Sequence, residues 1–164
     1  MHMDADPSVA IIIAAYNSCA TIARAVQSAL APIETSEVIV VDDASTDDTS
    51  STARAADDGS GRLKIITLTQ NGGPSAARNR AILESNAPWI CVLDADDFFL
   101  PGRLKGLLSF TEGADFVADD IWRVEERDIT GTRKNLLGPD FTKACWINFS
   151  EFVLSNVSST KRHR

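Results

Sequence analysis

Residues 89–97 read WICVLDADD, an apolar run that ends abruptly in acidic residues. Residues 37–43, EVIVVDD, repeat this arrangement earlier in the chain. Short continuous apolar runs that are rich in β-branched residues predict strands buried on both faces, as in a parallel sheet. Residues 9–15 (VAIIIAA) and 63–68 (LKIITL) predict two more such strands. The chain is therefore expected to contain four buried strands, two of which end in carboxylates.

Helical patterns fill the intervals between these strands. Helices are expected over residues 20–30, from a cap at Ser45 or Thr46 to about residue 56, from Ser75 onward, and over residues 101–110. This alternation predicts an α/β fold, a Rossmann-like and mostly parallel sheet flanked by helices.

Weaker patterns follow in the last third of the chain. Residues 116–118 predict a fifth strand, and residues 121–126 with 133–137 predict a hairpin around Thr130-Gly131. A short helix is expected near residues 150–154.

The composition is that of an ordinary globular domain. The 164 residues are 44% hydrophobic and carry 16 Lys and Arg against 23 Asp and Glu, a formal net charge of −7. This acidic balance argues against nucleic acid as a partner. Because there is no secretory signal or membrane-spanning run, a cytoplasmic location is expected, and peripheral association of a longer form with the inner face of the membrane stays open. Buried, reduced thiols are expected at Cys19 and Cys91.

The carboxylates after two strands are the strongest chemical signal. Asp42-Asp43 follows one strand and Asp94-Ala95-Asp96-Asp97 follows another, so both groups should lie at the same edge of the sheet. Carboxylates gathered in this way repel one another unless a cation or hydrogen-bond donors compensate. A Mg²⁺ or Mn²⁺ ion fits this need, since it accepts a few carboxylates and then phosphate oxygens. Asp47 and Asp48, in contrast, suit a structural role in the first turn of a helix.

A glycine-containing loop joins the third strand to the next helix. Residues 71–79 read NGGPSAARN, in which the glycines allow close backbone approach and Arg78 could pair with a phosphate. As an isolated motif, however, it favours a structural turn over phosphate contact. His2 and His163 lie at the two ends of the chain, so no catalytic histidine or Ser-His-Asp arrangement is expected.

Taken together, these stretches resemble the family 2 glycosyltransferases, which use the GT-A nucleotide-sugar-binding fold. The matching motifs run in chain order: VAIIIAAYN at 9–17, EVIVVDDASTDDT at 37–49, NGGPSAARNRAI at 71–82 and LDADDFFLPGRL at 93–104. Residues 114–124, ADFVADDIWRV, are most similar to enzymes of bacterial exopolysaccharide synthesis, including the succinoglycan type.

The resemblance implies a donor site for a nucleotide diphosphate-sugar, with a UDP-sugar as the expected donor. The residues that it places around the nucleotide are Ala15, Tyr16, Asp42, Asp43, Arg78 and Asp94. Asp96, with Asp94, would hold Mn²⁺ or Mg²⁺. The expected reaction is a metal-dependent, inverting transfer to a saccharide or lipid-linked saccharide acceptor, as in the growth of an exopolysaccharide.

The resemblance also implies a division of the chain. Residues 1–140 match the donor-binding part, and residues 141–164 match the start of an acceptor-side region that is cut short. The family's catalytic base lies in a later acidic motif, so it is expected beyond Arg164. Glu151 lacks that motif and is not assigned the role.

Three other interpretations remain open from the sequence. A donor-binding fragment without turnover differs from the enzyme only in activity. A phosphotransferase of the haloacid dehalogenase type also places D-x-D after a buried strand, with Asp94 as nucleophile, but Phe98 stands where that family has Thr or Val. A phospho-receiver domain has an acidic pair like Asp42-Asp43, but on its first strand rather than its second.

Overall fold

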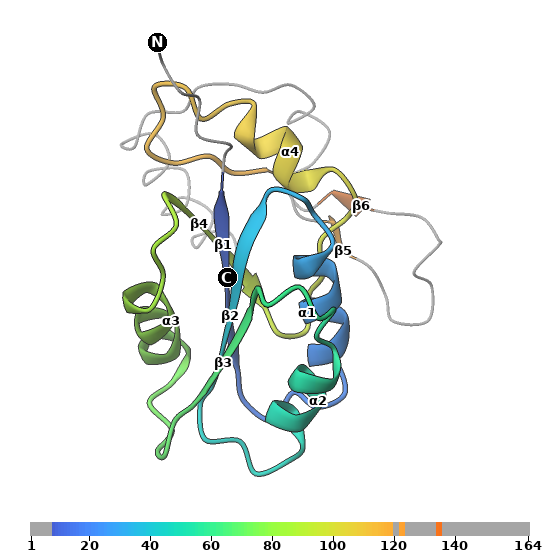
Figure 1. Ribbon diagram of the computed structural model, residues 1–164, viewed down its shortest axis with the longest axis vertical. Coiled ribbons are helices and arrows are strands. Elements are labelled where there is room, and N and C mark those ends of the chain that lie inside the picture. The colour runs from blue at the N-terminus through green and yellow to red at the C-terminus, as the bar shows by residue number, and fades with distance from the viewer. Residues whose placement is uncertain (1–7, 120–121, 124–133, 136–164) are drawn as a thin grey trace, which may run out of the picture. The chain divides into compact units, whose positions relative to one another are not determined.

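The computed structural model describes residues 8–119, 122–123 and 134–135. The chain divides into two compact units, Met1–Val117 and Ala118–Arg164, and each is described by itself. The first unit contains the four expected strands and the helices between them (Figure 1).

The first unit is built on a four-stranded parallel sheet. In space the strands follow the order β3-β2-β1-β4. Their bounds are Val9–Ala15 for β1, Thr35–Asp42 for β2, Leu63–Thr67 for β3 and Trp89–Asp94 for β4. All three strand pairs run parallel, which confirms the expected mostly parallel sheet.

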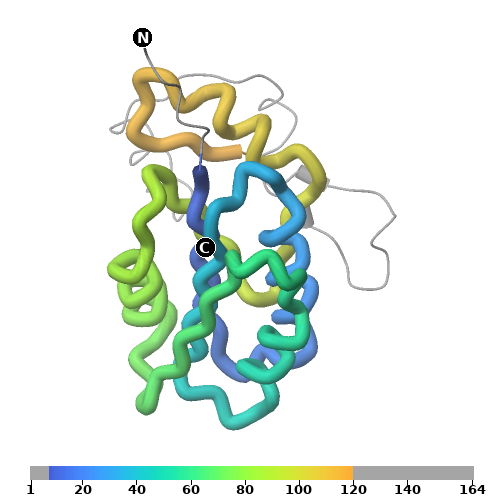
Figure 2. Tube along the Cα trace, viewed as in Figure 1, coloured from blue at the N-terminus to red at the C-terminus, as the bar shows by residue number. Residues whose placement is uncertain are grey.

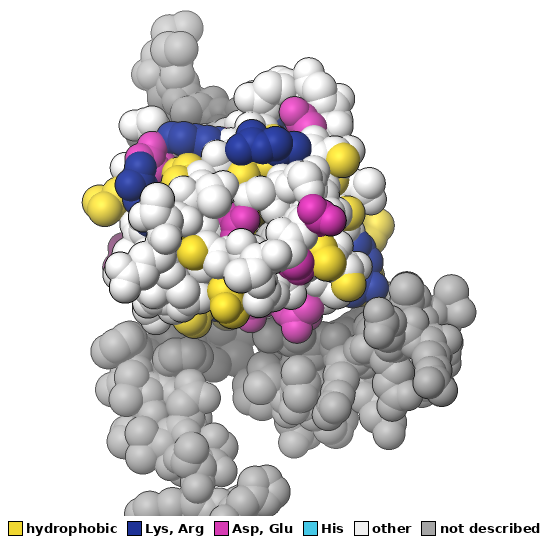
Figure 3. Space-filling view, turned by 90° about the horizontal axis from the view of Figure 1, so that it is seen from below, with side chains coloured by type: hydrophobic (Ala, Val, Ile, Leu, Met, Phe, Trp, Pro, Cys, Tyr) yellow, Lys and Arg dark blue, Asp and Glu magenta, His cyan; other side chains and the backbone are white. Residues whose placement is uncertain are grey.

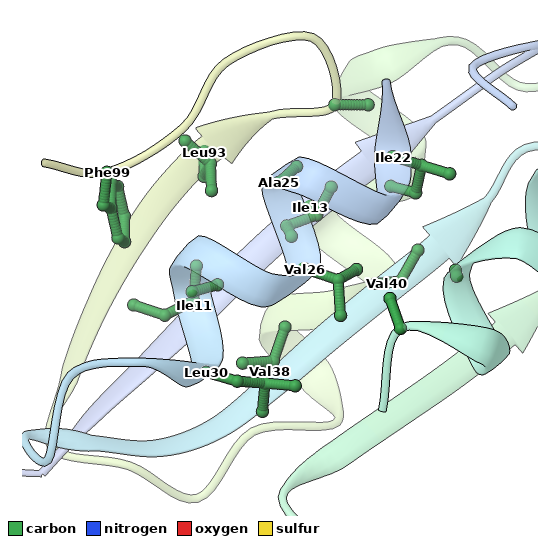
Figure 4. Close-up of a cluster of buried hydrophobic side chains, with 14 of the residues drawn as sticks. Ile11, Ile13, Ile22, Ala25, Val26, Leu30, Val38, Val40, Leu93 and Phe99 are labelled. Atoms are coloured by element: carbon green, nitrogen blue, oxygen red, sulfur yellow. The ribbon is translucent and has the colours of Figure 1, made fainter. Parts of the chain in front are cut away.

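The central position of β1 explains its uninterrupted apolar sequence. Alternate residues of a strand point to opposite faces, and helices cover both faces of this sheet. Ile11 and Ile13 pack on one face with Val38 and Val40, whereas Ile12 packs on the other with residues of the helix that follows β3. Figure 4 shows the first of these clusters.

The helices lie on both sides of the sheet, as Figures 1 and 2 show. The helices α1 (Ile22–Leu30) and α2 (Thr49–Ala55) contact each other on one face, and α3 (Pro74–Leu83) packs on β1 and β2 from the other. The inward residues of α1 follow helical spacing: Ile22, Ala25, Val26, Ala29 and Leu30. Helix α4 (Arg103–Leu108) follows β4.

Arg62, just before β3, caps the carboxyl end of α1. Its guanidinium donates hydrogen bonds to the carbonyl oxygens of Leu30 at 2.7 Å, Thr35 at 3.2 Å and Pro32 at 3.3 Å. Asp58 pairs with the same guanidinium at 2.9 Å. The last carbonyls of a helix lack partners within the helix, so a cation here satisfies them and opposes the negative end of the dipole.

The bounds of two helices differ from the sequence-based expectation. Helix α2 begins at Thr49 rather than after a cap at Ser45 or Thr46, because the hydroxyls of both residues bind Asn17: Ser45 Oγ accepts its backbone N–H at 2.9 Å, and Thr46 Oγ1 donates to its Oδ1 at 3.3 Å. Helix α4 is shorter than predicted at both ends, and Gly102 precedes it with a φ of 81°.

The predicted strand at residues 116–118 was wrong, since these residues form no strand in the structure. An apolar triplet is too short to fix a strand without a partner edge. In the second unit, β5 (Trp122–Arg123) pairs antiparallel with β6 (Lys134–Asn135), which confirms the hairpin for the described residues. The helix expected near residues 150–154 lies outside the described residues.

Candidate functional site

Three neighbouring strands end at one edge of the sheet. The register sets Ala15 of β1 opposite Asp42 of β2, and Ala14 opposite Asp94 of β4. The backbone N–H of Asp43 also donates to the carbonyl oxygen of Ala15 at 2.8 Å. Figure 3 looks onto this edge from below and shows acidic side chains at several separate points of the face. The expected gathering of both acidic motifs at one edge is thus present.

Asp42 is a buried structural carboxylate. Its Oδ1 accepts the backbone N–H of Ser45 at 2.9 Å, and its Oδ2 accepts the Ser50 hydroxyl at 2.5 Å. The Ser50 hydroxyl lies 3.0 Å from that of Thr67 on β3. Burying a carboxylate is costly unless donors surround it, and these contacts provide them. Asp42 thereby joins the loop after β2 to α2 and β3.

Asp43 holds the glycine loop in place. Its two carboxylate oxygens accept the backbone N–H groups of Gly72 at 2.8 Å and Gly73 at 2.7 Å, and Asn71 Nδ2 donates to its carbonyl oxygen at 3.2 Å. Gly73 has a φ of 84°, and a Cβ on Gly72 would come within 3.0 Å of the Ala76 Cβ. Glycine suits both positions, because the positive φ at Gly73 is strained for other residues and a Cβ at Gly72 would crowd Ala76.

Arg78 binds the first carboxylate of the D-x-D motif. Its Nη2 lies 2.6 Å from Asp94 Oδ1, and the two side chains are 34% and 54% exposed. Its Nε is buried and has no hydrogen-bond partner among the described residues. Arg78 was expected near a base or a phosphate; in the structure, helix α3 carries it to Asp94 at the end of β4.

Asp94, Asp96 and Asp97 form an exposed acidic turn after β4, in which the Asp97 N–H donates to the Asp94 carbonyl at 3.0 Å. Partial burial, together with the charges of Asp96 and Asp94, raises the pKa of the Asp97 carboxyl above its usual value. Burial is the main cause of the rise, and the two neighbouring carboxylates add to it by disfavouring a further negative charge at Asp97.

The carboxylates of this turn suit a divalent cation whose remaining ligands are phosphate oxygens and water. Within the described ranges, no group of three or more His, Cys, Asp and Glu side chains is arranged to hold a metal ion. Mg²⁺ and Mn²⁺ sites at phosphates commonly use one or two carboxylates and take their remaining ligands from phosphate and water. Asp94 and Asp96 offer such a pair.

A hydrogen-bond network ties the loop after β1 to the loop after β2. Asn17 Oδ1 accepts the Thr46 N–H at 2.9 Å, and Asp47 Oδ2 accepts the Cys19 N–H at 3.1 Å. Asp47 Oδ1 also accepts the Thr49 hydroxyl at 2.5 Å. The same network contains the contacts Asn17 N–H to Ser45 Oγ and Ser18 N–H to Thr49 Oγ1. Asp47 is thus structural, as the sequence suggested, but it links two loops rather than only starting a helix.

The residues at the end of β1 differ in exposure. Ala15 is buried, and Tyr16 is 51% exposed at the edge where the strands end. Cys19 is exposed and Cys91 is half-buried, so the expectation of a buried thiol at Cys19 was wrong. Asn17, in the loop between β1 and Cys19, has a φ of 49°, in the left-handed region that Asn tolerates better than most residues. A hydrogen bond to the Asp47 carboxylate raises the pKa of the Cys19 thiol.

Sequence reasoning missed two members of this network, Asn17 and Thr49. Their signal was local: a polar Asn directly after a buried strand and an Asp-x-Thr triplet both favour side-chain hydrogen bonds to nearby backbone. The pairing of the two loops depends on strand order, which those residues do not reveal.

The sequence model described as glycosyl transferase family 2 matches residues 10–160. This chain belongs to that family. The structure agrees with this: the chain is similar to S. aureus TarS 1–349 in complex with UDP-GlcNAc, with a TM-score of 0.57, 31% identity, and coverage of 65% of this chain and 31% of the TarS 1–349 chain. It is also similar to the mannosyltransferase PcManGT from Pyrobaculum calidifontis in complex with GDP-Man and Mn²⁺ (TM-score 0.57, 25% identity, 62% and 31% coverage). The fold of this family 2 chain is that of the GT-A glycosyltransferases, as predicted.

The family 2 chain is similar to two proteins of succinoglycan biosynthesis and to a glucosyltransferase. The succinoglycan biosynthesis protein ExoU of Rhizobium meliloti is 61% identical over 121 residues, which are 74% of this chain and 35% of ExoU. ExoO of the same organism is 42% identical over 73% of this chain and 34% of ExoO. The glucosyltransferase WfaP of Escherichia coli, named for UDP-Glc and a diphosphoundecaprenol-linked acceptor, is 36% identical over 91% of this chain and 59% of WfaP. The chain spans about a third of the length of ExoU and ExoO.

None of the helices within the described ranges combines the length and the hydropathy that a bilayer crossing requires.

Proposed function

We propose that this chain binds the donor of a glycosyltransferase that takes a sugar from a UDP-sugar. The carrying observation is the juxtaposition, at one edge of the sheet, of the exposed Asp94–Asp97 turn, the Asp43-bound glycine loop and the end of β1. Open α/β sheets bind ligands beyond the carboxyl ends of their strands. The UDP-GlcNAc complex of TarS supports a uridine nucleotide as the donor class.

Each predicted donor-site residue takes a defined role in this proposal. The backbone at Ala15 and the exposed Tyr16 would border the nucleotide. Asp43 would contact the base through the carboxylate lone pairs that do not accept the N–H groups of the glycine loop. Asp42 would act indirectly, by ordering the loop that follows it. Arg78 would hold Asp94 toward the ribose.

Asp96, with Asp94, would hold Mn²⁺ or Mg²⁺. The Mn²⁺ complex of PcManGT supports a divalent ion, and such an ion, when bound to the diphosphate, neutralises charge on the departing nucleotide. The residues of this chain contribute by orienting the two carboxylates and by keeping the turn open to solvent. We expect an inverting transfer, in which a carboxylate base takes the proton of the acceptor hydroxyl. We assign that base to none of the described carboxylates.

We propose a saccharide or lipid-linked saccharide acceptor, on the strength of the succinoglycan relatives and of WfaP. The exopolysaccharide setting, the cytoplasmic location and the peripheral association of a longer form with the membrane belong to this proposal. So does the division at residue 140, which falls outside the described residues. The family match favours this function over both phosphoryl-transfer alternatives.

Calorimetric titration with UDP, with Mn²⁺ present and then with a chelator, tests the donor site. We expect metal-dependent binding that Asp96→Ala removes. Asp57→Ala is the matched control, because Asp57 lies in the loop between α2 and β3, away from the edge where the strands end. Absence of binding to UDP, dTDP and GDP alike would contradict the proposal.

A further inference from the structure

Helix α1 contacts the acidic turn at two points. We define the carboxylate loop as residues 94–99, from the end of β4 to Phe99. Arg24 Nη2 donates to the carbonyl oxygen of Asp96 at 3.1 Å, and Ser28 Oγ accepts the backbone N–H of Phe99 at 3.0 Å. Arg24 and Ser28 are four residues apart, so they lie on the same face of the helix.

The end of the carboxylate loop is anchored firmly by Ser28 and Phe99. The Ser28 hydroxyl donates to the Ala25 carbonyl at 2.9 Å, which orients it to accept from Phe99. The Phe99 ring is buried, and Figure 4 shows it beside Leu93 at the edge of the core under α1. Asp96 itself is exposed, and in the middle of the loop only the small side chain of Ala95 reaches the same core.

Arg24 is well suited to hold this middle part. Its guanidinium carbon lies 4.8 Å from the ring centroid of Phe98, within the range of a cation–π contact. The guanidinium thus lies over the ring while one N–H reaches the Asp96 carbonyl. A lysine ammonium keeps the charge but cannot combine these two contacts in one fixed geometry.

We propose that Arg24 is a positioning residue for Asp96. Its hydrogen bond fixes the peptide from which the Asp96 carboxylate projects, and so sets that carboxylate toward a divalent cation that accompanies a nucleoside diphosphate. The ordering of the loop is a property of the free protein. The second part of the proposal, in which Asp96 is set toward a cation, rests on the donor-binding function proposed above. The role differs from that of Arg78, which binds the carboxylate of Asp94 directly.

Hydrogen exchange of the ligand-free 164-residue chain tests the ordering of the loop. In Arg24→Met, which keeps an apolar stem of similar length, we expect the backbone amides of residues 97–99 to exchange about three- to tenfold faster, the effect of losing roughly one hydrogen bond. Arg24→Lys should be intermediate. Arg80→Met is the matched control, because Arg80 lies on α3 and pairs with Glu84. Unchanged exchange in Arg24→Met would overturn the proposal.

Titration with UDP tests whether Arg24 sets Asp96 toward the cation. With Mn²⁺ present, Arg24→Met should raise the Kd for UDP about three- to tenfold relative to wild type. With a chelator present, the variant and wild type should have the same Kd for UDP. Equal weakening with and without the metal would overturn the positioning role, since it would indicate contact with the nucleotide or a general loss of structure. If wild type binds no UDP, the proposed donor function fails, and the exchange measurement alone decides whether Arg24 orders the loop.

Discussion

At the scale of single residues, the carboxylates of one sheet edge have different tasks because different donors surround them. Asp43 is 2% exposed and accepts two backbone N–H groups, whereas Asp94 is half-exposed and faces Arg78. Asp43→Asn would set an amide NH₂ against one of the two glycine N–H donors. We expect it to lower the free energy of unfolding by about 1–3 kcal/mol.

The same substitution at Asp94 is the control for this prediction. An exposed ion pair contributes only about 0–1 kcal/mol, so Asp94→Asn should have a small effect. Urea unfolding of the two variants and wild type measures the difference. Equal destabilisation by both variants would refute the structural role assigned to Asp43.

Asp47 makes the stability of the linked loops depend on pH. Hydrogen bonds from the Thr49 hydroxyl and from Cys19 lower the pKa of its carboxyl from 3.8 to about 2. A carboxyl whose pKa is lower in the folded state stabilises the fold at any pH above its unfolded-state pKa. This contribution is lost as the pH falls from about 4 to about 2. Asp47→Asn should therefore be less stable than wild type at pH 7, with a smaller difference at pH 2.5.

Urea midpoints at both pH values measure this effect. Asp48→Asn provides the control, since Asp48 precedes α2 without a side-chain capping hydrogen bond. A deficit of Asp47→Asn that stays constant from pH 7 to pH 2.5 would show that the ionised carboxylate is not the stabilising group.

At the scale of elements, the side chain of Arg62 caps the carboxyl end of α1. Arg62 donates to the carbonyl of Leu30, the last residue of α1, and to those of Pro32 and Thr35 in the connection to β2. Arg62→Met removes these donors and leaves the carbonyls to water, so we expect a loss of about 1–3 kcal/mol in the free energy of unfolding. Arg54→Met, on α2, should change it by less than about 0.5 kcal/mol. Thermal unfolding followed by circular dichroism compares the two, and equal melting temperatures would contradict the capping role.

The sequence predicted elements well where a periodic pattern spans a whole strand or helix. The run at residues 9–15 predicted β1 with its observed bounds, because only a strand covered on both faces tolerates seven apolar residues in succession. The start of α2 was missed because Asn17, distant in sequence, engages the hydroxyls of Ser45 and Thr46, the residues expected to cap it. The acidic edge was predictable from strand ends alone, but the pairing of Arg78 with Asp94 required the packing of α3 on the sheet.

At the scale of the whole molecule, Met1–Val117 forms a compact unit with its own core. We expect a chain that ends at Val117 to fold and to unfold in one cooperative transition. Trp89, the one tryptophan in this stretch of the sequence, packs against the core and reports on tertiary structure. Coincident urea transitions by Trp89 fluorescence and by circular dichroism are expected. Separate transitions would show that the unit needs residues after Val117.

The strand order β3-β2-β1-β4 has a consequence for synthesis on the ribosome. One edge of β1 pairs with β2 soon after both emerge, but the other waits for β4, roughly 70 residues further along the chain. At typical translation rates this wait lasts about 4 to 15 seconds. During that time the apolar strand at the centre of the future sheet has an open edge, which other nascent chains can pair with. The newly made N-terminal half is therefore a natural client for chaperones that shield extended apolar segments.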